Sequence, residues 1–375
     1  MNLTPFKLER YFTQYEHTAK YSLCNSDCES MSIRELLNFE PESRERFEQV
    51  WLGYTHTKGA QDLREQISNI YNRVSDENIL VCTGAQEPIF LFSQALLSRE
   101  DEVIVQTPCY QSLESIPQSI GCKVLSWNVR YRDGAHHFDL NELSELITEQ
   151  TKIIYLNTPH NPTGYLFTKE EQKEIIRLAK EKDIIVFCDE VYRELEYDPS
   201  DALPTIADAY ENGVSIGVMS KTYGLPGLRI GWMTSQNSTI LEKVAVLKEY
   251  TTICNAAPSE FLATLALRNR GKILERNIGI IKTNLELYVR FFAKYGDLFS
   301  WHKPTAGPIS LVKMNFDEDD FQFAQRVRKE YDVLLLPGSI YDFKGYFRIG
   351  LGRKGISPAL NEFEKFVEKE VVLNI

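Results

Sequence analysis

The segment KIIYLNTPHNPTGYLFTKEEQKEIIRLAKEKDIIVFCDEVY (residues 152–192) decides the fold class. It begins and ends with short apolar runs that are typical of strands, at residues 152–156 and 183–187. Between them, residues 168–182 are good helix formers, and Thr168 and Glu171 have the spacing of a capping box. A strand, a helix and a second strand in this order predict a crossover between two parallel strands.

Similar units lie on both sides of this segment. Strands are predicted at residues 79–83, 102–106, 123–127 and 213–219, and helices at residues 62–71 and 87–98. Continuous apolar strands separated by helices predict an α/β fold with a mostly parallel sheet sandwiched by helices. After residue 237 the pattern changes to two long helical stretches (240–268 and 272–295), followed by separated strands and helices. This change predicts a smaller α+β domain at the C-terminus, whereas residues 1–35 have the composition of an irregular arm.

Composition excludes several classes of partner. The chain has 375 residues and a net charge of -11, with no run rich in Lys and Arg, so nucleic acid and anionic membranes are poor partners. Seven cysteines are scattered without a C-x-x-C pair, which favours a reducing cytoplasm over disulfides or a metal site. The first residues lack the apolar core of a signal peptide, and no apolar run approaches the roughly 18 residues of a transmembrane helix. We expect a cytoplasmic protein.

Polar residues follow the predicted strands, where sites of open α/β sheets form. Gly84-Ala85-Gln86 follows the strand at 79–83 and opens a helix, so that free N–H groups can face a phosphate. Asn161-Pro162-Thr163-Gly164 follows the strand at 152–156, and Asp189 ends the strand at 183–187 with Tyr192 three residues later. Each feature alone is also typical of an ordinary turn or helix cap.

A lysine and an arginine follow the last predicted strand of the large sheet. Ser220 and Lys221 come directly after residues 213–219, and Arg229 lies eight residues further on. A lysine beside another cation in a dry pocket has a lowered pKa, which suits Schiff-base chemistry. A lone lysine is usually solvated, so the joint order of all these motifs carries the argument.

SKTYGLPGLRIGW (residues 220–232) and NTPHNPTG (residues 157–164) together resemble the fold-type-I pyridoxal-phosphate (PLP) enzymes of the class I/II aminotransferase family. The resemblance covers roughly residues 50–370. It implies an arm at residues 1–45 that is part of the small domain, a large PLP-binding domain at 46–270 and a small domain at 271–375. It also implies PLP as cofactor, and an amino acid and a 2-oxo acid as substrates in amino-acid metabolism.

The resemblance implies a role for each matching residue. Lys221 forms the internal aldimine and shuttles a proton, Asp189 pairs with the pyridinium nitrogen, and Tyr110 stacks on the ring. Asn161 and Tyr192 hydrogen-bond the ring oxygen, and Asn161 also lies beside the substrate. The phosphate is held by the turn Gly84, Ala85 and Gln86, by Ser220 and by Arg229. Arg348 grips the substrate carboxylate, and Tyr54 reaches the phosphate of a neighbouring subunit, which implies a homodimer with shared active sites.

Two positions depart from the family pattern. Val218 stands where the family often has a serine that binds the phosphate. The arm at residues 25–30 lacks the usual glycine-rich stretch and carries Asp27 and Glu29 instead. Since residues two apart share a face of an extended segment, both could pair with a cationic substrate side chain. This arm resembles the capreomycidine-synthase branch, in which the reaction is a cyclisation or an elimination.

Three other functions compete with transamination. Gly350-Leu351-Gly352-Arg353-Lys354-Gly355 matches a dinucleotide-binding motif, but the chain ends too soon after it for a βαβ unit. A binding protein without catalytic activity does not need the lysine and the aspartate. A lyase or cyclase acting on a basic amino acid remains the alternative, because it needs the same lysine and aspartate as a transaminase.

Overall fold

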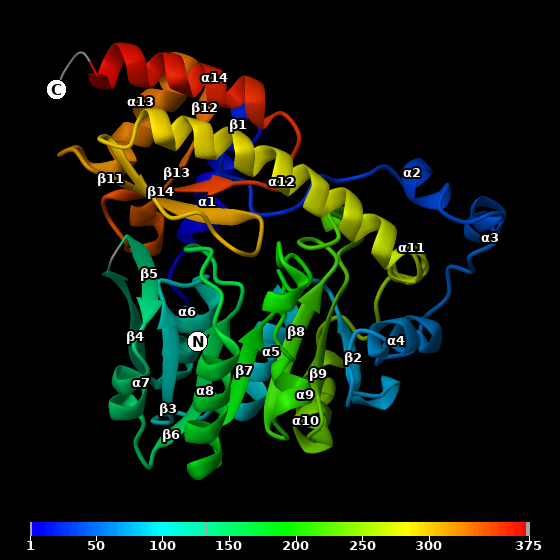
Figure 1. Cartoon of the computed structure of the whole chain (residues 1–375). Helices are drawn as coiled ribbons and strands as arrows, with labels where there is room; N and C mark the ends of the chain where they lie inside the picture. The colour runs from blue at the N-terminus through cyan, green and yellow to red at the C-terminus, as the bar shows by residue number, and fades with distance from the viewer. Residues whose placement is uncertain (1, 133, 373–375) are drawn as a thin grey trace.

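The computed structural model describes residues 2–132 and 134–372. In this part of the chain, one large sheet of eight strands forms the lower half of Figure 1. In spatial order its strands are β2 (Ile79–Cys82), β9 (Gly231–Ser235), β8 (Gly213–Val218), β7 (Ile185–Asp189), β6 (Thr151–Asn157), β3 (Glu102–Thr107), β4 (Lys123–Arg132) and β5 (Ala135–Phe138). The strands from β8 to β4 pair in parallel, whereas β2, β9 and β5 pair antiparallel. The predicted mostly parallel sheet is confirmed.

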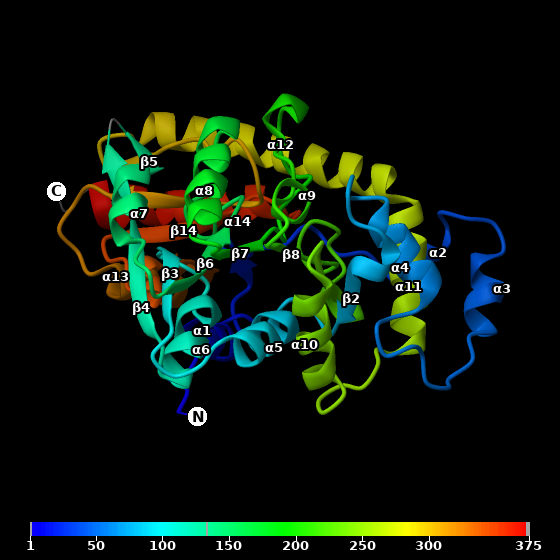
Figure 2. The same cartoon turned by 90° about the horizontal axis from the view of Figure 1, so that it is seen from below.

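Helices cover both faces of this sheet (Figure 2). One layer consists of α5 (Gln86–Leu96), α6 (Ser112–Ile120) and α10 (Ser238–Lys248), and the other of α7 (Leu140–Leu146), α8 (Lys169–Glu181) and α9 (Ile206–Ala209). Alternate residues of a strand pack against the two layers: Val103 and Val105 of β3 face α5, and Ile104 faces the other side. Burial on both faces explains why these strands are continuous apolar runs.

A smaller antiparallel sheet lies above the large one in Figure 1. Its strands, in spatial order, are β10 (Phe299–Trp301), β11 (Ile309–Met314), β14 (Tyr346–Gly350) and β13 (Leu336–Pro337). The helices α12 (Arg270–Lys294), α13 (Asp320–Tyr331) and α14 (Ile356–Phe366) share its core, in which many aromatic rings are in contact. The predicted boundaries after residues 45 and 270 stay predictions.

The N-terminal arm is more regular than its composition predicts. It contains the helix α1 (Lys7–Tyr15), and β1 (Tyr21–Ser22) pairs in parallel with β12 (Val333–Leu334). The helix forms because Leu8 and Tyr11 lie on one face and are buried against the chain around Leu336. The expectation of a wholly irregular arm over residues 1–35 is therefore wrong.

A second departure lies in the chain between β9, a strand of the large sheet, and β10, the first strand of the small sheet. The predicted helical stretch at 240–268 is divided into α10 and α11 (Ala257–Arg268). In the intervening loop, Ile253 has a φ of 64°, which a helix cannot accommodate. The ammonium group of Lys248 donates to the carbonyls of Thr57 and Ile253 and so holds this loop against the chain before β2. Apolar composition alone did not reveal this interruption.

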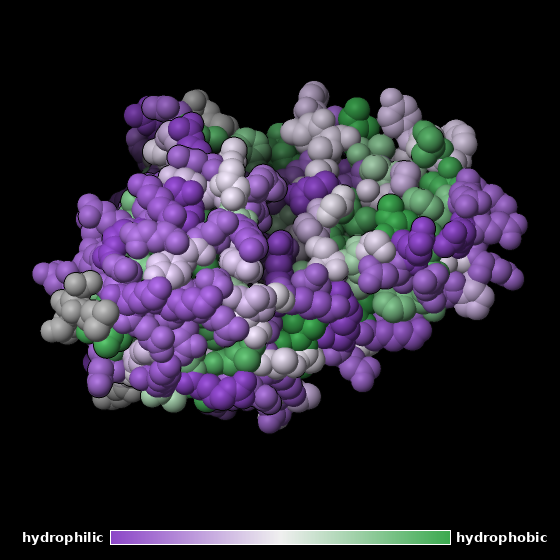
Figure 3. All heavy atoms as spheres, turned by 90° about the horizontal axis from the view of Figure 1, so that it is seen from above, coloured by the Kyte–Doolittle hydropathy of each residue, from purple (hydrophilic) through white to green (hydrophobic). Residues whose placement is uncertain are grey.

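The outer surface is mixed. Figure 3 shows hydrophilic side chains over most of the face above the small sheet, and more hydrophobic ones towards the end that carries α2 (Ile33–Leu37) and α3 (Ser43–Glu48). None of the described helices is both long and apolar enough to cross a membrane. Helices α4 (Gln61–Ser68) and α11 cover the β2–β9 edge of the large sheet.

Candidate active site

A cavity of about 520 Å³ lies at the carboxyl ends of the parallel strands, between the large sheet and α1. The strand-end motifs meet there, as the fold predicts. The cavity is lined by these residues that the sequence singled out: Asp27, Ala85, Gln86, Tyr110, Asn161, Asp189, Tyr192, Ser220, Lys221 and Arg229. Arg348 lies directly behind Asn161, whereas Glu29 and Tyr54 are not among the lining residues.

Lys221 extends from the end of β8 into this cavity. Its ammonium nitrogen donates to the hydroxyl of Ser26 at 2.9 Å. Burial lowers the pKa of Lys221, and the positive charge of Arg348 lowers it further. The negative charge of Asp27 raises it, but by less than burial lowers it. A lowered pKa raises the fraction of neutral amine, which is the nucleophilic form.

Asp189 ends β7 and faces the same cavity. Its side chain is buried, and its carboxylate accepts the backbone N–H of Val191 at 3.2 Å. Desolvation raises the pKa of Asp189 to about 6, although the backbone hydrogen bond and Lys221 oppose the shift. No salt bridge to Asp189 is formed within residues 2–132 and 134–372. A buried carboxylate without an ion-pair partner fits a cationic group in the cavity, such as a protonated pyridine nitrogen.

The turn before α5 provides an environment for an anion. Gly84 has a φ of 68°, and a Cβ atom placed on it would lie 2.5 Å from the guanidinium of Arg229. The positive φ favours glycine here, and the absence of a side chain lets the guanidinium approach the turn. α5 begins at Gln86 without a side-chain cap, so the positive end of the helix dipole faces the cavity next to Arg229. The residues present fit the phosphate of PLP.

Arg348 lies on β14 and is fully buried. Its guanidinium donates to the carbonyl oxygen of Cys24 at 2.7 Å, to the side-chain oxygen of Asn161 at 3.1 Å and to the hydroxyl of Tyr341. It has no carboxylate partner in the described part of the chain. A buried guanidinium held by neutral oxygens fits a ligand that brings its own carboxylate.

Two aromatic residues complete the cavity. Tyr110 donates its hydroxyl to Glu9 at 3.1 Å and packs its ring against Phe6. Tyr192 is buried, and desolvation raises the pKa of its hydroxyl, so that it stays protonated. It can therefore act as a hydrogen-bond donor within the cavity.

The structure separates the two acidic residues of the arm. Asp27 lines the cavity, but Arg353 binds both of its carboxylate oxygens, at 2.8 and 2.7 Å. Glu29 instead accepts the backbone N–H of Lys354 at 2.8 Å, away from the cavity. An extended segment would place the side chains of Asp27 and Glu29 on one face. In the structure only Asp27 faces the cavity, so the expectation that both point into one pocket is wrong.

Tyr54 does not line the cavity of its own chain, and 85% of its surface is exposed. Its neighbours Trp51 and Leu52 are exposed by 79% and 81%, and Tyr250 by 85%. The hydroxyl of Thr55 donates to the carbonyl of Asn255 and joins the two loops that carry these residues. Large apolar side chains thus gather on one exposed surface.

Several residues of the site were missed from the sequence. Asn157 ends β6, donates to the carbonyl oxygen of Asp189 at 2.7 Å and accepts the N–H of Asn161 at 2.5 Å. As a polar residue at a strand end, it could have been found by the rule that revealed Asp189. Ser26 and Arg353 lie in loops and gave no such signal, because only the tertiary fold brings them to the cavity.

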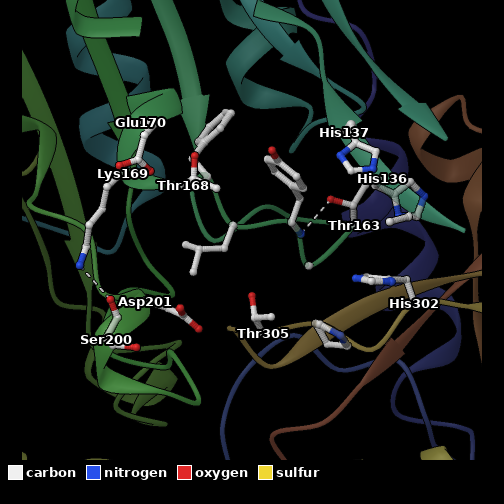
Figure 4. Close-up of a pocket in the computed structure, with 16 residues that line it drawn as sticks. His136, His137, Thr163, Thr168, Lys169, Glu170, Ser200, Asp201, His302 and Thr305 are labelled. Carbon is white, nitrogen blue, oxygen red and sulfur yellow. Dashed lines mark hydrogen bonds between the residues drawn. The ribbon is translucent and has the colours of Figure 1, made fainter. Parts of the chain in front are cut away.

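A second cavity of about 480 Å³ lies on the other side of the Asn161–Gly164 loop (Figure 4). Figure 4 shows His136, His137 and His302 on one side of it and Lys169, which donates to the carbonyl of Ser200, on the other. Among the described residues, no group of three or more His, Cys, Asp or Glu side chains is arranged to hold a metal ion. The lysine, the aspartate and the helix N-terminus all belong to the first cavity, which is therefore the candidate active site.

Comparison with known proteins gives consistent matches over most of the chain. A family model for aminotransferase class I and II matches residues 20–356. A probable aspartate aminotransferase of Methanocaldococcus jannaschii is 27% identical over 367 residues, which cover 93% of this chain and 96% of that protein. Capreomycidine synthase of Streptomyces vinaceus is 24% identical, with 91% and 86% covered. The crystal structure of a PLP-dependent aminotransferase from Streptococcus suis has a TM-score of 0.93 and 30% identity, and covers 98% of this chain and 99% of that chain.

The buried carboxylate of Asp189 has a measurable effect on the stability of the protein without cofactor. Its pKa of about 6 lies above the unfolded value of about 3.9, so the native state binds more protons between these two pH values. The contribution of this group to stability therefore falls as the pH rises from about 4 to about 6 and stays low above that. Asp189→Asn removes this titration and should raise the free energy of unfolding by about 1–3 kcal/mol at pH 7 but little at pH 4.

Urea unfolding of the two apoproteins across this pH range measures the difference. A difference between them that does not change with pH would show that Asp189 is already compensated in the native state.

Proposed function

The chain belongs to the class I and II aminotransferase family as a PLP-dependent aminotransferase, and we propose that Lys221 is the residue that holds the cofactor and moves the proton during transamination. The observation that carries this proposal is the meeting of Lys221 and Asp189 in one cavity, at the ends of the adjacent parallel strands β8 and β7. The reaction moves an amino group between an amino acid and a 2-oxo acid.

Bound PLP supplies a conjugated ring that accepts negative charge from the α-carbon of the substrate. Asp189 would hold a proton on the ring nitrogen of bound PLP, because a buried carboxylate without an ion-pair partner favours a cationic neighbour. The side-chain oxygen of Asn161 is already bound by Arg348 and Tyr341, so its amide nitrogen is the group left to donate to the ring oxygen. Tyr192 would donate to the same oxygen, and Tyr110 would cover a face of the ring, since both line the cavity.

The phosphate is bound at the N-terminus of α5. The N–H groups of Ala85 and Gln86, the hydroxyl of Ser220 and the guanidinium of Arg229 border this end of the cavity. Val218 stands on β8 with its side chain buried, so it offers the phosphate no hydroxyl group. Phosphate binding therefore depends on the helix terminus and Arg229.

The substrate carboxylate binds Arg348. This guanidinium is fully buried, and neutral oxygens are its hydrogen-bond acceptors among the described residues. A substrate carboxylate supplies the missing negative charge, and the planar fork of arginine fixes its orientation. The α-carbon is then held beside Lys221, which removes a proton from it and returns one during the reaction.

A cyclase is the second candidate, favoured by the similarity to capreomycidine synthase. Proton removal from the α-carbon by Lys221 serves both reactions. They differ in the products, because transamination releases a 2-oxo acid and a cyclase returns an amino acid.

The functional unit is a homodimer in the cytoplasm. A second copy of the chain covers the exposed surface of Trp51, Leu52, Tyr54 and Tyr250, since exposed apolar patches of this kind mark interfaces. Tyr54 then reaches the phosphate of the partner subunit. All seven cysteines are free thiols, which supports a reducing compartment.

The first prediction from the proposed function concerns Lys221. Mixing the holoenzyme with its amino-acid substrate should convert the aldehyde form of the cofactor to the amine form and release one equivalent of 2-oxo acid, as followed by absorbance and product analysis. Borohydride reduction before substrate is added, followed by peptide mapping, should label Lys221. A label on another lysine would refute the assignment, and an amino-acid product without a 2-oxo acid would favour the cyclase.

The second prediction concerns Arg348. Arg348→Lys loses the planar fork and should weaken transition-state binding by about 2–5 kcal/mol, seen mainly as a raised KM for the amino acid. The affinity for PLP should change little, as measured by fluorescence titration. Tyr341→Phe keeps the guanidinium and should retain most of the activity. Equal losses of PLP and substrate affinity in Arg348→Lys would indicate a structural role instead.

The third prediction concerns assembly. Tyr54→Phe and Lys221→Ala should each have low activity, but a mixture of the two should recover part of it. In a hybrid dimer, one active site contains both substitutions. The other active site contains the unchanged Lys221 of one subunit and the unchanged Tyr54 of the other. Subunit exchange is verified by mass spectrometry. Exchange without recovery of activity would contradict a site shared between subunits.

A further inference from the structure

Helix α1 presents one face to the active-site cavity. Leu8, Glu9, Phe12 and Glu16 line it, and their spacing places them on the same side of the helix. The family match begins at residue 20, so this face lies outside the segment that carries the common chemistry. No step of the proposed reaction uses these four side chains.

This face lies next to the carboxylate-binding group. The ring of Phe12 is 5.9 Å from the guanidinium carbon of Arg348. Glu9 accepts a hydrogen bond from the hydroxyl of Tyr110. Its negative charge also raises the pKa of Lys221, although desolvation has the larger effect and lowers it. A substrate with its carboxylate on Arg348 and its α-carbon near Lys221 therefore has α1 along its side chain.

The other charges around the cavity are already balanced. Asp27 is bound by Arg353 through two hydrogen bonds. Under the proposed function, Asp189 faces the ring nitrogen and Arg229 faces the phosphate. Glu9 and Glu16 are left, and neither forms a salt bridge within the described part of the chain. Glu16 accepts a hydrogen bond from the neutral amide of Asn25 at 3.2 Å.

We propose that Glu9 and Glu16 select an amino acid with a cationic side chain, of the ornithine, lysine or arginine class. The methylene groups of such a side chain pack on Phe12 and Leu8, and its cation pairs with a carboxylate of α1. Acidic side chains are excluded by repulsion from the same two carboxylates. This inference rests on the proposed function, because it needs the substrate carboxylate at Arg348.

The test compares pairs of amino acids that differ in the side-chain charge and little in shape: ornithine with norvaline, lysine with norleucine, and arginine with citrulline. The rate of conversion of the cofactor gives kcat/KM for each. The cationic member of at least one pair should react about 10-fold or more faster than its neutral partner, as for a charge-assisted contact. This preference should decrease as salt is added, because the carboxylates are partly exposed.

Variants assign the preference to α1. Glu9→Gln and Glu16→Gln should each reduce the ratio of kcat/KM between the cationic and the neutral member of a pair, and the double variant should bring this ratio to about 1. Glu286→Gln removes the same charge from the exposed outer face of α12 and is the matched control, which should leave the preference unchanged. Calorimetric titration of holoenzyme carrying Lys221→Ala should show the same preference in binding alone, without turnover.

The outcomes separate the two proposals. If neutral or acidic amino acids react as well as cationic ones, transamination stands and the selection by α1 is wrong. If a cationic preference persists in the double variant, other residues create it and the assignment to Glu9 and Glu16 is wrong. If no amino acid of any charge converts the cofactor, the proposed function itself fails.

Discussion

The parallel pairing of β6, β7 and β8 is the constraint on which the site depends. In this register Asn157 lies opposite Asp189, and Asp189 lies opposite Ile216 of β8, five residues before Lys221. The side chain of Asn157 reinforces the pairing, because it donates to the carbonyl of Asp189 and accepts the N–H of Asn161. Residues from three separate segments are thereby brought to one edge, and a shift of register by one residue would turn the aspartate away from the cavity.

This constraint explains which site residues could be predicted from the sequence. Strands buried on both faces are continuous apolar runs, so their ends are visible, and a polar residue at such an end must lie at the carboxyl edge of a parallel sheet. Asp189 and Lys221 were singled out in this way, and both line the candidate cavity; Gly84 was singled out by the helix that follows it. Asn157 follows the same rule and opens the stretch NTPHNPTG, but within that stretch a role was assigned to Asn161 and not to Asn157. The large sheet with its two helix layers was predictable for the same reason.

The remaining residues of the site depend on contacts between segments that are far apart in the chain. Arg353 reaches Asp27 across 326 positions, and Arg348 reaches the carbonyl of Cys24 across 324. Nothing in the local sequence of the arm indicates that Asp27 is neutralised while Glu29 caps the backbone at Lys354. Leu8, Tyr11 and Tyr15 have helical spacing in the sequence. The helix that they form is short, however, and its stability comes from packing on the small domain.

The residues at the strand ends and the residues of α1 are held in place by different parts of the fold. Asp189 ends β7 and Lys221 follows the end of β8, so the positions of both are set by the large sheet. Helix α1 is attached to the small domain, through the hydroxyl of Tyr11 on the carbonyl of Leu335 at 2.7 Å and the ion pair of Lys7 with Asp342 at 2.6 Å. Its buried face maintains this attachment, and its other face lines the cavity with Glu9 and Glu16. The side chains of Glu9 and Glu16 take no part in the contacts that attach α1, so they can change without loss of the fold.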